Sequence, residues 1–108
     1  MKIVKLSPTE EIILQAIFDL QDASEEVPVP ELTEHLGKKC GKDYARTTVV
    51  TFIERMATKG AVTKYRKGRI SYVIPLYSKE AYRDFLVNEL ISGWYNGDRD
   101  EFVRDITK

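Results

Sequence analysis

The sequence predicts a mainly α-helical fold that carries one small β-hairpin, and three features of its 108 residues support this. Apolar side chains recur every three or four residues in several segments, which is the spacing of one helix face. Two short runs alternate apolar and polar side chains on either side of Lys67-Gly68, as hairpin strands do. The length suits a modest core. We divide the chain into a first domain over residues 1–76 and a helical region over residues 77–108.

The first predicted helix covers residues 8–21. Ser7 and Glu10 have the spacing of a capping box, in which each side chain bonds the backbone N–H of the other, and Pro8 suits the first helical position. The apolar stripe of this helix contains Ile12, Ile13, Ala16, Ile17 and Leu20. The prolines in segment 27–30 keep it extended, so it can pair as a short strand.

A helix-turn-helix is predicted next. Pro30 can open a second helix over residues 30–36, with Gly37 as its stop, and residues 38–43 then form a polar turn. The third helix covers residues 45–59. Its core stripe contains Val49, Phe52, Ile53 and Met56.

The opposite side of this third helix carries short hydroxyls, methyl groups and guanidiniums, and no acid before Glu54. Threonine can donate to or accept from a base edge and can press its methyl group on thymine, whereas arginine reaches guanine or phosphate. Threonine is also a poor helix former, so three of them on one short helix need another reason. The side chains that would face a DNA major groove are Arg46, Thr47, Val50, Thr51 and Arg55.

Two strands are predicted directly after the third helix, which Gly60 ends. They cover residues 61–66 and 69–74 and would form the wing of a winged helix-turn-helix. The tip, residues 66–69, contains three cations that would lie against phosphates. Such contacts supply affinity but carry no sequence information.

The net charge of the chain is zero, but the charges are unevenly distributed. Residues 1–37 carry two basic and eight acidic side chains, and residues 38–72 carry ten basic and two acidic ones. Residues 73–108 carry five basic and seven acidic side chains. A cluster of cations in one third of the chain suits a polyanion, although charge alone allows a merely solvated face as well. The neighbouring helix pattern favours the polyanion.

Two further helices are predicted in the last third, over residues 79–95, capped by Ser78, and over residues 99–107. The apolar stripe of the helix over residues 79–95 exceeds what a small winged domain needs, which indicates a partner interface. The predicted dimerisation residues are Tyr82, Phe85, Leu86, Leu90, Ile91, Trp94, Phe102, Val103 and Ile106. The aromatic residues around Trp94 leave a small-molecule pocket open as an alternative.

Nothing in the sequence favours an enzyme, a cofactor or a metal site. His35 is the only histidine and Cys40 the only cysteine, and neither has a motif partner. We interpret His35 as a surface or capping residue. A single cysteine and the absence of a signal peptide or of a run of about 20 apolar residues predict a cytoplasmic protein without a membrane partner.

Several stretches of the chain resemble the penicillinase-repressor family, which includes the β-lactam-responsive BlaI and MecI type and the copper-responsive CopY type. They are Leu6-Ser7-Pro8-Thr9-Glu10, Pro28-Val29, Tyr44-Ala45-Arg46-Thr47-Thr48-Val49-Val50-Thr51, Arg55, Lys59-Gly60 and Gly68-Arg69-Ile70-Ser71-Tyr72-Val73-Ile74-Pro75-Leu76. The resemblance implies a winged-helix DNA-binding domain, C-terminal dimerisation helices and a homodimeric repressor on a pseudo-palindromic operator. It places Arg46, Thr47, Val50 and Thr51 at the bases, Thr48 and Arg55 at base edges or phosphates, and Arg66, Lys67 and Arg69 on the wing.

The chain departs from the family in three ways. It lacks the C-terminal cysteine cluster of the copper-responsive type, which argues against copper sensing by that route. Asp105-Ile106 stands where the β-lactam-responsive type is cut at an Asn-Phe bond, which argues against induction by a sensor protease. The family continues past the position of Lys108, so either the dimer interface is smaller here or the natural chain is longer. The sequence does not identify an inducing effector or protease. The alternative function is a winged-helix protein–protein assembly module that binds no DNA.

Overall fold

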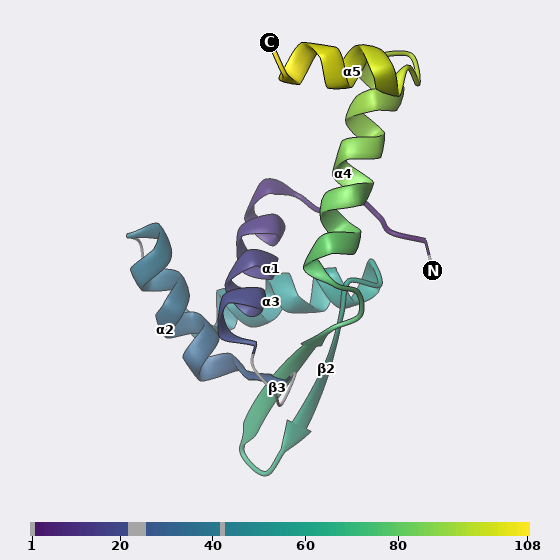
Figure 1. Ribbon diagram of the computed structural model, residues 1–108. Helices are drawn as coiled ribbons and strands as arrows, with labels where there is room; N and C mark the ends of the chain where they lie inside the picture. Colours follow the sequence, from purple (N-terminus) through teal and green to yellow (C-terminus); the bar gives the residue numbers. More distant parts are fainter. Residues whose placement is uncertain (1, 22–25, 42) are drawn as a thin grey trace. The chain divides into compact units, whose positions relative to one another are not determined.

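The computed structural model describes residues 2–21, 26–41 and 43–108, which form five helices and three strands (Figure 1). In chain order these are α1 (Pro8–Leu20), β1 (Val27–Pro28), α2 (Val29–Cys40), α3 (Arg46–Thr58), β2 (Val62–Lys67), β3 (Ile70–Pro75), α4 (Lys79–Trp94) and α5 (Arg99–Ile106). The chain divides into two compact units, residues 1–77 and 78–108. None of the described helices is long and apolar enough to cross a membrane.

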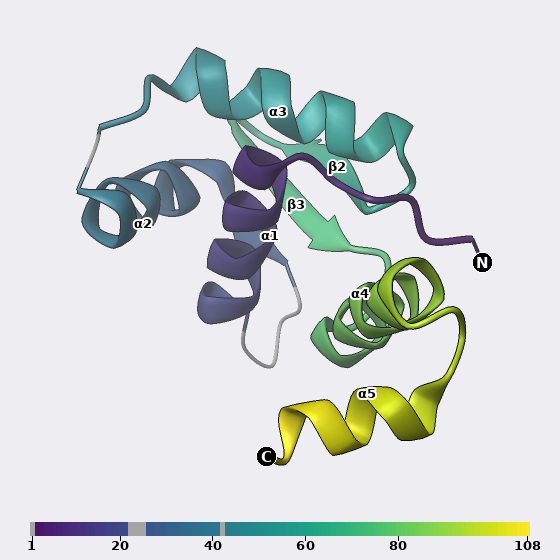
Figure 2. The ribbon, with the colours of Figure 1, turned by 90° about the horizontal axis from the view of Figure 1, so that it is seen from above.

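The first unit encloses its core between three helices and the sheet, and Figure 2 shows α1, α2 and α3 grouped beside β2 and β3. The predicted apolar stripes are confirmed at their centres, because the central apolar residues of each helix are almost fully buried. They are Ile13, Ala16 and Ile17 of α1, Leu32 and Leu36 of α2, and Val49, Ile53 and Met56 of α3. This packing leaves the opposite sides of α2 and α3 to solvent.

The three strands form one antiparallel sheet in the order β1-β3-β2. The extended segment before α2 does pair as a short strand, with Val27 opposite Val73. The hairpin turn lies one residue later than predicted, because β2 runs to Lys67 and β3 starts at Ile70. Gly68 occupies the turn with a φ of 66°, a left-handed conformation that glycine adopts without strain.

The prediction that Gly37 ends the second helix is wrong. Helix α2 continues through it to Cys40 and is capped by Gly41, whose φ of 64° places it in the left-handed region. A Cβ atom at Gly37 would lie 2.9 Å from Oδ1 of the exposed Asp43 side chain, which can move aside. Either glycine could end the helix by its sequence position, and the backbone conformation of the folded chain selects Gly41.

A buried ion pair connects the start of α1 to the end of α3. Ser7 and Glu10 form the predicted capping box, and Oε1 of Glu10 accepts hydrogen bonds from the Ser7 amide at 2.7 Å and from Nζ of Lys59 at 2.6 Å. The Glu10 side chain is 1% exposed. Burial by itself raises the pKa of Glu10, but the hydrogen bonds from Lys59 and Ser7 outweigh it and hold this pKa below its ordinary value.

The second unit contains α4, α5 and a tight turn between them. The hydroxyl of Ser78 caps α4 by accepting from the Ala81 amide at 3.0 Å, as predicted, and Asp98 caps α5 by accepting from the Glu101 amide at 3.0 Å. Asn96 and Gly97 both have positive φ in the turn. The ring of Tyr95 meets that of Phe102 edge to face, with centroids 5.3 Å apart.

Candidate nucleic-acid interface

The side of α3 that faces away from the core is open. Arg46, Thr47, Thr48, Thr51 and Arg55 are exposed, and Val50 is half-buried. The helix begins without a side-chain cap and without an acid in its first turn. Since a helix N-terminus carries a partial positive charge, this end of α3 favours an anion.

Hydrogen bonding distinguishes the threonines of this face. The Thr51 hydroxyl donates to the Thr47 carbonyl oxygen at 2.9 Å, so it presents its methyl group and its acceptor lone pairs to solvent. Among the described residues, the Thr47 hydroxyl has no hydrogen-bond partner and can still donate. The two side chains, one turn apart, therefore offer complementary functions to a base edge.

The only acid of α3, Glu54, is paired within the chain. Nζ of Lys64 on β2 lies 3.2 Å from its Oε1. The Arg55 guanidinium lies over the Phe52 ring at 5.4 Å from the centroid. The pair with Lys64 thus joins α3 to the wing and reduces the repulsion that a free carboxylate would exert on DNA.

The wing presents its cations on two different faces. Side chains alternate across a strand, and Arg66, opposite Ser71, therefore lies on the same face as Lys64, which reaches α3. Lys67 lies on the other face, where its Nζ is 5.0 Å from the centroid of the Tyr72 ring and 3.1 Å from Oε1 of Glu26. A DNA contact of Lys67 stays a prediction, and its side chain lies on the face of the wing opposite Lys64 and Arg66.

Helix α3, the wing and the start of α2 line one open groove of about 250 Å³. This α3–wing groove is lined by Arg46 and Val50 of α3, by Arg66, Arg69, Ile70 and Ser71 of the wing, and by Val29 and Pro30 of α2. No carboxylate lines it. Across the residues that the structure describes, Arg46 and Arg69 form no ion pair, whereas Nε of Arg66 donates to the Gly68 carbonyl oxygen at 3.2 Å. Unneutralised guanidiniums from two elements thus meet at one surface.

Four residues that line this groove were not predicted from the sequence as site residues: Val29, Pro30, Ile70 and Ser71. The pairing of Ser71 with Arg66 follows from the hairpin register, so a correctly placed turn would have identified it. Nothing in the sequence indicates that the start of α2 reaches the wing, because this contact depends on how β1 joins β3.

His35 belongs to a polar cluster that joins α1 to α2. Its Nε2 lies 3.0 Å from Oδ2 of Asp19, and Nζ of Lys39 lies 2.9 Å from the same oxygen. Hydrogen bonds from His35 and then from Lys39 hold the pKa of Asp19 below its ordinary value. The cluster stabilises the helix pair by binding one carboxylate to two donors.

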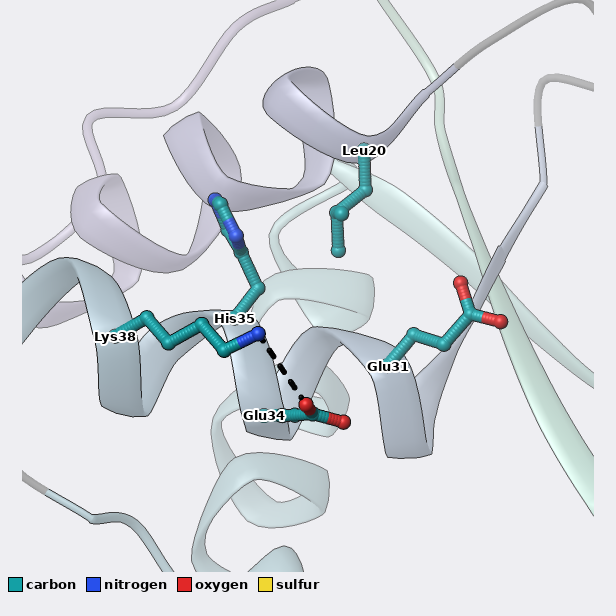
Figure 3. Close-up of a pocket in the computed structure, with 5 residues that line it drawn as sticks. All are labelled: Leu20, Glu31, Glu34, His35 and Lys38. Atoms are coloured by element: carbon teal, nitrogen blue, oxygen red, sulfur yellow. Dashed lines mark ion pairs between the residues drawn. The ribbon is translucent and has the colours of Figure 1, made fainter.

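A shallow hollow of about 190 Å³ lies beside this cluster and is lined in part by Leu20 and Lys38. Figure 3 shows the carboxylates of Glu31 and Glu34 turned away from the imidazole of His35, and Glu34 instead pairs with Lys38 at 3.3 Å. Within residues 2–21, 26–41 and 43–108, no three His, Cys, Asp or Glu side chains are grouped so that they could hold a metal ion.

The predicted dimerisation residues differ widely in exposure. Tyr82 and Ile91 are buried within the chain, so they offer little surface to a second copy. Phe85, Leu86 and Phe102 are half-buried, whereas Trp94 is 82% exposed. The Trp94 side chain therefore projects into solvent. The other exposed members of the set are Leu90, Val103 and Ile106.

Comparisons with known proteins identify the family of the chain and its fold. Residues 6–108 match the family described as penicillinase repressor. The DNA-binding domain of the repressor BlaI is similar in structure, with a TM-score of 0.59 and 22% identity over 75% of this chain and 92% of that domain. Monomeric BlaI of Bacillus licheniformis in complex with the blaP half-operator is also similar, with a TM-score of 0.57 and 22% identity over 75% of this chain and 92% of that one.

A third similar structure is a complex described as hsRosR-S1, with a TM-score of 0.59 and 19% identity over 94% of this chain and 88% of that one. At such identities these likenesses show the fold, which is a winged helix. A search of curated protein sequences finds no match to this chain.

Proposed function

The chain belongs to the penicillinase-repressor family of DNA-binding transcriptional regulators, and from this premise we propose that it is a repressor that binds a pseudo-palindromic operator as a homodimer. One observation carries the proposal: the α3–wing groove joins the open threonine and arginine face of α3 to the arginines of the wing without a carboxylate between them. Duplex DNA is a polyanion with base edges accessible in its major groove, and this surface offers donors for both.

In the proposed complex, α3 enters the major groove while the wing contacts the adjacent backbone. Thr47, Val50 and Thr51 contact base edges, and Arg46 reaches a base or a phosphate at the start of the helix. Arg66 and Arg69 bind phosphates from the wing. Two copies would place their α3 helices in successive major grooves, about 34–36 Å apart. Such a regulator acts in the cytoplasm, where the DNA is.

Alanine at Thr47 or Thr51 is expected to reduce the preference for the operator over random duplex by roughly 1–3 kcal/mol for each lost base contact. The reason is that these side chains distinguish bases, whereas the cations bind any sequence. Competition binding with operator and random DNA measures the difference between the two affinities.

Thr58→Ala is the matched control, because Thr58 lies on the same helix and its hydroxyl donates to the Glu54 carbonyl oxygen as that of Thr51 donates to Thr47. This variant should keep the operator preference of the wild type. If Thr47→Ala and Thr51→Ala weakened operator and random DNA equally, base recognition by these threonines would be ruled out.

The homodimer is proposed to form through the exposed apolar residues of α4 and α5. A Leu90→Asp substitution should then weaken dimerisation by roughly 2–4 kcal/mol, because it places an unpaired charge in an apolar interface. Sedimentation equilibrium measures this change. Leu76→Asp is the control, since Leu76 has the same exposure of 41% but lies in the first unit. A wild-type chain that is monomeric at micromolar concentration would contradict the proposed interface.

The assembly-module alternative makes the opposite prediction for DNA. A chain of that kind would bind no duplex even at low salt, where the cations of this protein should bind most strongly. Filter binding at about 50 mM salt with random duplex therefore separates the two hypotheses before any operator is identified.

A further inference from the structure

We propose that the α3–wing groove also binds a small phosphate monoester that carries an apolar group, and that this ligand displaces DNA. Three arginines, one from α3 and two from the wing, are among the residues that line this groove. The inference that the ligand displaces DNA rests on the proposed function, whereas the inference that it binds does not.

The first argument concerns charge. Arg46, Arg66 and Arg69 line the groove, and no carboxylate does. A phosphodiester of the DNA backbone carries a single negative charge, whereas a monoester carries about −1.5 to −2 at neutral pH and offers three acceptor oxygens. A guanidinium binds such a group through paired N–H donors. The cations around this single space therefore match a monoester better than one backbone phosphate.

The second argument concerns the apolar part of the lining. Val50 of α3 and Pro30 of α2, which both line the groove, are half-buried and so keep part of their apolar surface exposed. A phosphate alone would leave this surface in water. An apolar substituent on the phosphate would cover it and gain the free energy of that burial.

The third argument concerns size. A volume of about 250 Å³ lies just below the range of roughly 300–1,000 Å³ that is usual for pockets of drug-sized ligands. A ligand of about ten non-hydrogen atoms suits it. Phenyl phosphate meets the three requirements of charge, apolar body and size and is the probe for the test.

The first experiment titrates the DNA-free protein with phenyl phosphate and with inorganic phosphate, by calorimetry or by amide chemical shifts. Phenyl phosphate should bind at least tenfold more tightly. Arg46→Ala and Arg69→Ala should each weaken its binding at least tenfold, and Val50→Ser should remove most of the preference for the phenyl group. Arg83→Ala, in the second unit, is the control for a lost arginine and should bind as the wild type does. Circular dichroism confirms that each variant is folded.

Equal affinity for the two probes, or wild-type binding by Arg46→Ala, would overturn the site. The second experiment adds phenyl phosphate to the protein–DNA complex, with sodium sulfate at equal ionic strength as the control for screening. The apparent Kd for DNA should rise in proportion to phenyl phosphate and exceed the rise in sulfate. A bound ligand that leaves the Kd unchanged would refute displacement, and a chain that binds the ligand but no DNA would refute the repressor function while supporting the site.

Discussion

Replacing both Arg66 and Arg69 with alanine is expected to lower the affinity for every DNA sequence by roughly 30- to 1,000-fold near 0.1 M salt. The estimate assumes about 1–2 kcal/mol for each charge-assisted phosphate contact. The slope of log K against log salt should fall by about 2, because each phosphate contact contributes about 0.9. Operator and random duplex should lose affinity together, since phosphates are present in every sequence. Fluorescence anisotropy at several salt concentrations measures both quantities.

The control for this prediction removes two cations elsewhere, with Lys38→Ala and Arg83→Ala combined. Lys38 is already paired with Glu34, and Arg83 lies in the second unit. The net charge changes equally in the two double variants, so a general electrostatic effect would weaken DNA binding to the same degree in both. A salt slope that stays at its wild-type value in the Arg66 and Arg69 variant would exclude the wing from the interface.

Lys59→Met is expected to lower the free energy of unfolding by roughly 2–3 kcal/mol at neutral pH. The variant leaves the Glu10 carboxylate buried without its cation, and breaking a buried pair on one side typically costs about 3–5 kcal/mol. We use a smaller value because the Lys59 side chain is 34% exposed, so solvent screens it in part. Urea unfolding followed by circular dichroism measures the loss.

The pH dependence of this variant has a definite sign. The pKa of Glu10 is lowered in the folded chain, so the carboxylate stabilises the fold above its unfolded pKa and loses this contribution as the pH falls through the folded value. The difference between wild type and Lys59→Met should therefore shrink under acidic conditions. Lys5→Met is the control, because its pair with Glu11 is more exposed and should contribute less than about 1 kcal/mol. A difference that is constant with pH would show that packing, and not the charge of Glu10, causes the loss.

Local signals in the sequence were sufficient to predict most of the elements. The capping box at Ser7, the cap at Ser78 and the periodicity of Val49, Ile53 and Met56 each depend on residues within one or two turns. Such signals act through backbone hydrogen bonds and helix geometry, which do not need the rest of the molecule. The composition of the exposed face of α3 could be predicted in the same way, because the buried apolar stripe of a helix determines which side chains lie on the opposite side.

The predicted end of α2 was wrong because Gly37 and Gly41 are equivalent stop signals in the sequence, and only the folded backbone shows that Gly41 has the left-handed conformation. Other features are decided by the fold and have no counterpart in a local pattern. Lys67 and Arg66 are adjacent cations in the sequence, yet the strand pairing places them on opposite faces of the wing. Tyr82 and Trp94 belong to one apolar stripe, but their exposed fractions are 6% and 82%.

The sequence by itself determined the order of the elements, the open threonine and arginine face of α3 and the cationic character of the wing, because these follow from helix periodicity, turn chemistry and local charge. Only the tertiary structure decided that Arg46, Arg66 and Arg69 line one groove with Val29 and Ile70, and that Lys59 reaches Glu10. The physical reason is that strand register and helix packing bring together residues up to 49 positions apart, and a periodic pattern carries no information about such distances.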